Sequence, residues 1–239
     1  MIIGNGLVAK AFAPRWAEST DVVIIAAGVS NSAERDPVEF AREQRLIDSV
    51  LDEGSHAQVV YFGSCAVGNP HDPSSHYLSH KASMERRVLS DPRGLVLRLP
   101  QVVGAGGNPH TLTNFLHSRI ESGLPFDVWA LAERNLIDID DVASIGGHII
   151  ENRADFESMV PVAAINSKTM LYIVHEMERV LGKSANYRAL EKGVPFPIDT
   201  EQCQRAAARL DIQLGEGYVP RLLQKYYGST PSIRALAGF

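Results

Sequence analysis

Short apolar runs that alternate with longer mixed segments constrain the fold of this chain more than any other feature. Buried strands are predicted at residues 1–3, 21–28, 58–62 and 95–99. The segment at residues 36–53 carries apolar residues at helical spacing, namely Phe40, Leu46, Ile47, Val50 and Leu51. Strands that alternate with helices form a mostly parallel sheet with helices on both faces. The sequence therefore predicts an α/β fold.

A glycine-rich turn follows the first predicted strand. Residues 4–9 read GNGLVA, which matches the G-x-G-x-x-G/A pattern of dinucleotide-binding turns. Gly4 permits a tight turn, Gly6 lets the backbone approach a diphosphate, and the following helix presents free N–H groups to the phosphates. We expect Pro14 to end or kink that helix. The turn predicts a shortened, Rossmann-type doubly wound parallel sheet that binds NAD or NADP through Gly4, Asn5, Gly6, Leu7 and Val8.

The adenosine end of such a cofactor has no evident partner in the sequence. Rossmann folds place an acidic residue about 20 positions after the glycines, at the end of the second strand. Position 24 is Ile, and Asp21 lies at the wrong end of its strand. We therefore predict a dinucleotide-binding domain at residues 1–150 that lacks the usual second and third strands. Residues 151–239 would form a smaller substrate-binding portion, partly interleaved with the first, and the choice between NAD and NADP stays open.

Small or polar residues follow several of the predicted strands. In parallel sheets, ligands bind outside the carboxyl ends of the strands, where these residues would meet. The sequence therefore predicts one shared site at this edge, with cofactor contacts from the glycine turn, Ala26, Ala27, Gly28 and Pro100, and with Ser64 beside them.

A tyrosine and a lysine are predicted on one face of the next helix. Ser74 or Ser75 can cap a helix that carries Tyr77 and Lys81, which are four residues apart. An ammonium beside a phenol lowers the pKa of the phenol, which would make Tyr77 a general acid or base near neutral pH. Such pairs are also common on solvated helix faces, so the position of this one after Ser64 carries the inference.

Six segments in this order resemble the extended short-chain dehydrogenase/reductases, in the branch of nucleotide-sugar epimerases, dehydratases and ketoreductases. The segments are GNGLVA, VVIIAAG, VVYFGSCAVG, HYLSHKASMER, LRLPQVVG and NLIDIDDVA, and they span about residues 1–150. The resemblance implies that Tyr77 is the acid or base and that Lys81 holds the nicotinamide ribose. It implies that Ser64 hydrogen-bonds the reacting oxygen. Glu43 or Gln44 stands where the family often has an asparagine.

The substrate side of the predicted site is less well defined. Cys65 and Ala66 follow Ser64 where dehydratases of this branch carry an Asp-Glu pair, which disfavours dehydration. His110 resembles a loop histidine of the fucose-synthase type, although a solvated loop histidine is the alternative. Arg134 is a cation that would meet substrate phosphates, or else a surface residue. The predicted substrate contacts are Cys65, Gln101, Asn108, His110 and Arg134.

The most consistent function is NAD(P)-dependent reduction of a 4-keto nucleotide sugar, with Tyr77 as the proton donor. A nucleotide-sugar epimerase is one alternative. A non-catalytic dinucleotide-sensing or scaffold protein of the same fold is another, because the missing adenosine segment should weaken cofactor binding.

Composition narrows the set of partners. The net charge is −5 and no Lys/Arg block occurs, so we expect neither nucleic acid nor an anionic membrane as a partner. Cys65 and Cys203 are too few for a disulfide framework or a metal site, which favours a reducing cytoplasm. We see no secretory leader and no apolar stretch of about 18–20 residues. A homodimer through residues 37–52 and 75–90 is implied by the resemblance alone.

Overall fold

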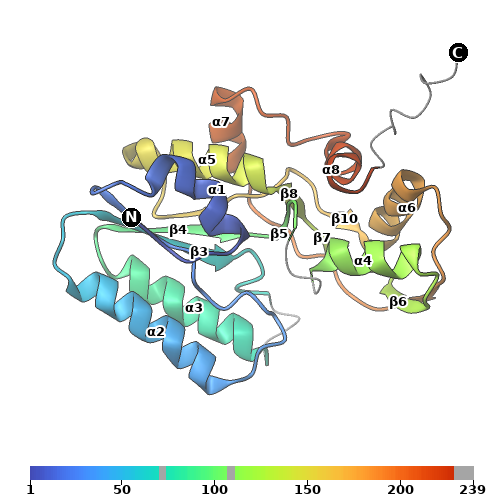
Figure 1. The fold of residues 1–239 in the computed structure, drawn as a ribbon, viewed down its shortest axis with the longest axis horizontal. Helices are drawn as coiled ribbons and strands as arrows, with labels where there is room; N and C mark the ends of the chain where they lie inside the picture. Colours follow the sequence, from blue (N-terminus) through green and yellow to red (C-terminus); the bar gives the residue numbers. More distant parts are fainter. Residues whose placement is uncertain (70–73, 107–110, 229–239) are drawn as a thin grey trace, which may run out of the picture.

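A five-stranded parallel sheet forms the centre of the chain. The computed structural model describes residues 1–69, 74–106 and 111–228. The strand order is β1 (Ile2–Ile3), β2 (Val22–Ile25), β3 (Gln58–Ser64), β4 (Gly94–Leu99) and β9 (Met159–Pro161). Every neighbouring pair is parallel. The predicted α/β, Rossmann-type doubly wound parallel sheet is confirmed (Figure 1).

Helices cover both faces of this sheet. The pair α2 (Pro37–Asp52) and α3 (His76–Leu89) covers one face, and α1 (Leu7–Trp16) with α5 (Ile139–Glu151) covers the other (Figure 1). Because both faces are covered, the strands are apolar along their length, and all four residues of β2 are buried.

Side-chain caps define the starts of the helices nearest the predicted site. The Asp36 carboxylate accepts from Val38 N–H at 2.8 Å to start α2, and Ser75 Oγ accepts from Leu78 N–H at 3.3 Å to start α3. Ser75 is therefore the cap of the helix that carries Tyr77. Pro14 does not end α1: the helix continues to Trp16, because a proline this close to the helix end removes only one late N–H donor.

The strand β1 lies at one edge of the described sheet. The helix α1 leads directly to β2, and within residues 1–69, 74–106 and 111–228 the sheet pairs β1 with β2 alone. A full Rossmann order continues past its first strand with two more strands. The described residues supply no strand there.

Most of the remaining elements lie beyond the carboxyl ends of the main strands, as Figure 1 shows for α4, α6 and α8. Three two-stranded pairs are formed by β5 (Gln101–Val103) with β8 (Leu136–Asp138), β6 (Phe126–Trp129) with β11 (Tyr187–Leu190), and β7 (Glu133–Arg134) with β10 (Lys168–Thr169). The helices beyond these ends are α4 (Leu112–Glu121), α6 (Met170–Leu181) and α8 (Tyr218–Tyr227). The other two, η1 (Arg153–Asp155) and α7 (Glu201–Arg209), contact α5.

Segments after residue 150 contribute to both parts of the molecule. The strand β9 completes the main sheet and α7 packs against α5, whereas α6 packs against α4 and α8. The division at residue 150 therefore stays a prediction.

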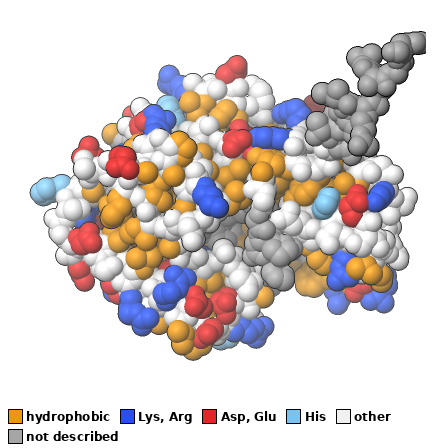
Figure 2. Space-filling model, in the orientation of Figure 1, with side chains coloured by type: hydrophobic (Ala, Val, Ile, Leu, Met, Phe, Trp, Pro, Cys, Tyr) orange, Lys and Arg blue, Asp and Glu red, His pale blue; other side chains and the backbone are white. Residues whose placement is uncertain are grey.

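Charged side chains of both signs occur on the visible surface. On the face drawn in Figure 2, acidic and basic side chains are interspersed with apolar ones. Among the described residues, none of the helices combines the length and the hydropathy that crossing a membrane requires. In the same residues, no group of three or more His, Cys, Asp or Glu side chains is arranged to hold a metal ion.

Candidate active site

The glycine turn has the geometry expected of a close backbone approach. Gly4 has φ +133°, and a Cβ at this position would lie 2.5 Å from the Ala26 carbonyl oxygen at the end of β2. Only glycine fits here, because both the backbone angle and the neighbouring strand exclude a side chain.

The N-terminus of α1 is open beside this turn. Gly6 is the N-cap, and no side chain caps the helix. A Cβ at Gly6 would meet nothing within 4 Å, so the backbone there faces open space. Asn5 is exposed, whereas Leu7 and Val8 are half-buried against the core. The first N–H groups of α1 are therefore accessible to an anion.

The end of β2 lies between the turn and the helix pair α2–α3. Ala26 N–H bonds the Ile3 carbonyl at 2.8 Å, and the Ala27 carbonyl accepts from Arg42 Nη1 at 3.2 Å. A Cβ at Gly28 would lie 2.4 Å from Glu43 Oε1 and 2.9 Å from Lys81 Nζ. A buried ion pair thus fills the space where a side chain at position 28 would stand.

Ser64 and Tyr77 are brought together at the carboxyl end of β3. Both side chains are half-buried, and hydrogen bonding from Ser64 acts on the pKa of the Tyr77 phenol. Burial raises the pKa of Tyr77 to about 12. The Ser64 hydrogen bond opposes this rise, and the negative charges of Glu43 and Glu85 add to it. Tyr77 is therefore protonated at neutral pH.

The buried Lys81 side chain donates hydrogen bonds to protein acceptors. Its side-chain Nζ lies 3.0 Å from Glu43 Oε1, 2.9 Å from the Tyr61 hydroxyl and 3.4 Å from the Phe62 carbonyl oxygen. A lysine ammonium has three donors, so all of them are directed at protein groups. Burial lowers the pKa of Lys81, and the Glu43 charge opposes this.

The prediction that Lys81 lowers the pKa of Tyr77 was wrong. The two residues do share one face of α3, but the lysine charge is balanced by Glu43, and burial moves the Tyr77 pKa upward. The helical spacing gave the face correctly and could not reveal a carboxylate that arrives from α2.

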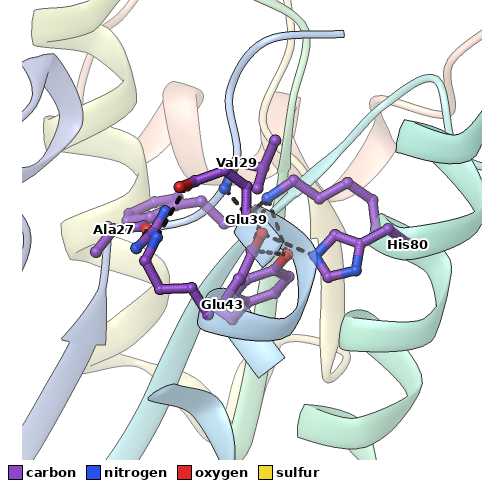
Figure 3. Close-up of polar contacts among 9 residues, drawn as sticks. Ala27, Val29, Glu39, Glu43 and His80 are labelled. Atoms are coloured by element: carbon purple, nitrogen blue, oxygen red, sulfur yellow. Dashed lines mark hydrogen bonds and ion pairs between the residues drawn. The ribbon is translucent and has the colours of Figure 1, made fainter. Parts of the chain in front are cut away.

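Of the two residues at the position where the family often has an asparagine, Glu43 is buried and Gln44 is exposed. Figure 3 shows the Glu43 carboxylate between Val29 and His80. Burial alone would raise the Glu43 pKa, but it falls to about 2, because His80, Lys81, the Val29 N–H and the Tyr61 hydroxyl together stabilise the anion.

A second buried carboxylate holds the backbone of Ser64. Glu85 Oε1 accepts from Ser64 N–H at 3.2 Å, and Glu85 Oε2 accepts from Arg98 Nε at 3.0 Å and Nη2 at 2.5 Å. Glu85 follows Tyr77 by two helical turns on the same face of α3. Glu85 was not predicted as a site residue, although its spacing from Tyr77 and Lys81 was a usable signal.

The predicted substrate contacts are less clearly grouped. The Cys65 thiol is buried and donates to the Arg98 carbonyl at 3.3 Å, and burial raises its pKa. Pro100 is half-buried after β4, and Gln101 begins β5 with its side chain exposed. Arg134 is half-buried in β7, where burial lowers its pKa and Nη1 donates to the Glu133 carbonyl at 2.7 Å. Asn108 and His110 lie outside the described residues.

A parallel sheet with an open glycine turn at its carboxyl edge is the architecture of dinucleotide-binding proteins. Residues 8–162, well over half of the chain, match the model of the NAD dependent epimerase/dehydratase family. The chain belongs to that family. None of the curated proteins compared with it gives a significant sequence match.

Solved structures share the fold at low sequence identity. UDP-glucuronic acid 4-epimerase from Bacillus cereus, in complex with UDP-glucuronic acid and NAD, is 18% identical with a TM-score of 0.69, over 87% of this chain and 74% of that one. dTDP-glucose 4,6-dehydratase from Bacillus anthracis, in complex with NAD, is 15% identical with a TM-score of 0.66, over 93% and 79% of the two chains. RMD from Pseudomonas aeruginosa, complexed with NADPH, is 16% identical with a TM-score of 0.65, over 93% and 86%.

Proposed function

We propose that this chain is an NAD(P)-dependent oxidoreductase that reduces the 4-keto group of a nucleotide-activated sugar. The observation that carries this proposal is that Ser64 and Tyr77 meet at the carboxyl edge of the sheet that bears the open glycine turn. Family membership supports a nicotinamide cofactor and a nucleotide-sugar substrate.

The residues of the turn fit the diphosphate of a nicotinamide dinucleotide. Open space at Gly6 and the uncapped N-terminus of α1 suit an anion held by backbone N–H groups. In the proposed complex, residues 4–8 hold the diphosphate, and residues 26–28 and Pro100 border the nicotinamide half. Lys81 would reach the ribose by exchanging its longest contact, the 3.4 Å one to the Phe62 carbonyl.

The chemistry assigns a distinct task to each side chain. A bound reduced nicotinamide supplies the hydride that adds to the C4 carbonyl carbon. As the C=O bond becomes a C–O single bond, Tyr77 donates its hydroxyl proton to the developing alkoxide, and Ser64 hydrogen-bonds the same oxygen. A phenol that is protonated at neutral pH is suited to this direction of transfer.

Oxidation of NADH or NADPH by nucleotide-activated 4-keto sugars tests the proposal. We expect absorbance loss at the reduced nicotinamide band with at least one such substrate. Because general acids contribute about 10²–10⁴-fold, Tyr77→Phe should lower kcat by about that factor and leave the folded state intact. Full turnover by Tyr77→Phe on an accepted substrate would refute the assigned role of Tyr77.

A nucleotide-sugar C4 epimerase is the second candidate. The family model and the fold shared with a UDP-glucuronic acid 4-epimerase favour it. Epimerisation begins with an oxidation in which the tyrosine must accept a proton, which the raised pKa of Tyr77 opposes at neutral pH. Interconversion of C4 epimers without net consumption of NADH would favour the epimerase.

A further inference from the structure

The buried carboxylate of Glu43 has no task in the reaction described above. We propose that Glu43 is a positioning residue: it binds the Lys81 ammonium and balances its charge within the protein, so that Tyr77 meets the substrate as a neutral proton donor. This inference rests on the proposed function and adds a residue that sets the protonation state of its acid.

Four protein groups hold the Glu43 carboxylate in place. Its Oε1 accepts from the Tyr61 hydroxyl at 2.7 Å and from Lys81, and its Oε2 accepts from Val29 N–H at 2.8 Å and contacts His80 Nε2 at 2.9 Å. The side chain is fully buried. These partners come from β3, from α3 and from the residue after Gly28, so the carboxylate cannot turn without breaking contacts to three parts of the chain.

His80 is itself held in place on the far side of the carboxylate. Its ring stacks on Phe40 of α2, with ring centroids 4.6 Å apart, and its side chain is 9% exposed. The ring contacts one oxygen of the Glu43 carboxylate, as Figure 3 shows, and therefore helps to hold that carboxylate in place.

The ammonium of Lys81 has no freedom to turn toward Tyr77 while Glu43 is ionised. Its side chain is 5% exposed, and a buried charge retains its partner because separation leaves an uncompensated ion. The missing side chain at Gly28 supports the same arrangement, because any Cβ there would strike both members of the pair. The sequence of this turn thus accommodates the ion pair.

The described groups around Tyr77 give the direction of the effect. The charged groups that act on the pKa of Tyr77 are Glu43 from α2 and Glu85 from α3, and Tyr61 of β3 is a titratable neighbour. Glu43 is paired with Lys81 and contacts His80, both from α3, and Glu85 is paired with Arg98 of β4. With Glu43 ionised, the positive charge of Lys81 is balanced, and burial dominates the pKa of Tyr77. With Glu43 neutral, the Lys81 charge would act on the phenol and lower its pKa.

Titration of Tyr77 in the cofactor-free protein tests this inference. Tyrosine labelled with ¹³C at Cζ gives the protonation state by NMR, and Tyr77→Phe assigns the signal. In the wild type we expect the Tyr77 signal to stay protonated to at least about pH 10.5, above the ordinary midpoint of about 10. In Glu43→Gln we expect the midpoint to fall by about one unit or more.

Asp48→Asn is the matched control. Asp48 is another carboxylate of α2 that pairs with a cation of α3, Arg87, but this pair lies on the surface away from the site. Loss of the Asp48 charge should leave the midpoint of the Tyr77 titration within about 0.3 pH units of the wild type.

In turnover assays, Glu43→Gln should keep KM. Its kcat for reduction should fall progressively as the pH rises through the lowered midpoint of Tyr77, whereas Asp48→Asn should keep the wild-type pH profile.

Three outcomes overturn the inference. The first is a wild-type Tyr77 that titrates clearly below about pH 10. The second is a folded Glu43→Gln variant whose Tyr77 titrates as in the wild type. If Glu43→Gln does not fold, Glu43→Gln/Lys81→Met removes both charges, which proteins often tolerate, and a lowered midpoint in that double variant is the third. Absence of any NADH or NADPH oxidation would instead end the proposed function, while the titration would still decide the role of Glu43.

Discussion

At the scale of single residues, the two glycines of the turn have separate tasks. Gly4 is required by the fold, because its φ is +133° and a Cβ would lie 2.5 Å from the Ala26 carbonyl oxygen. Gly6 has an ordinary φ of −76° and open space around it. A side chain at position 6 would therefore change the free energy of unfolding little. It would occupy the space through which a diphosphate approaches the backbone.

We predict that Gly4→Ala and Gly6→Ala separate stability from binding. Gly4→Ala should lower the free energy of unfolding by about 1–3 kcal/mol, because it combines a strained backbone angle with a close contact. Gly6→Ala should change it by less than about 0.5 kcal/mol and weaken NADH binding by about tenfold or more. Urea denaturation and calorimetric titration measure the two quantities. Unaltered NADH affinity in Gly6→Ala would exclude the turn as the diphosphate site.

At the scale of helices and strands, much of the architecture was predictable. The main strands were recognised because buried parallel strands are continuous apolar runs, and α2 and α3 were recognised from their caps and apolar spacing. The pair β6–β11 was missed, because two four-residue strands joined across about 60 residues leave no local pattern.

The site was only partly predictable for a related reason. Helical spacing correctly placed Tyr77 and Lys81 on one face, and the order of strands placed Ser64 beside them. The direction of the Lys81 ammonium depends on Glu43, which lies 38 residues earlier in another helix. Charge balance between distant segments is a tertiary property, so the pKa of Tyr77 was predicted with the wrong sign.

At the scale of the whole molecule, the sheet ends where the adenosine of a dinucleotide would lie. The strand β1 is the edge of the described sheet, and no acidic residue stands at the end of a second strand. Two parts of the chain fit a cofactor in the proposed complex. The turn would face the diphosphate, and the end of β2 would face the nicotinamide half.

We therefore predict weak dependence of binding on the adenosine half. NADH and NADPH should bind with dissociation constants within about threefold of each other, because no acidic residue stands at the end of a second strand to hold the ribose hydroxyls. Reduced nicotinamide mononucleotide should bind within about tenfold of NADH. Calorimetric titration of all three ligands measures this. A preference above about 30-fold for one dinucleotide would show that adenosine is recognised by residues not assigned above.

The predicted homodimer through α2 and α3 also belongs to this scale. The outward positions of these helices include polar, exposed residues at Arg45, Ser49, Ser79 and Arg86, and one exposed apolar residue, Val38. A dimer through them stays a prediction, and light scattering on the purified chain would decide it.

The most direct measurement follows the hydrogen that the proposed reaction transfers. The protein is incubated with a nucleotide-activated 4-keto sugar and NADH that carries deuterium at C4 of the nicotinamide, in each of its two stereoisomers. We predict that one isomer delivers a deuterium to C4 of the sugar, in step with NADH oxidation. We also predict that the yield of labelled sugar falls strongly in Tyr77→Phe. A reduced sugar without deuterium at C4, or an equal yield of labelled sugar from Tyr77→Phe, would contradict the account.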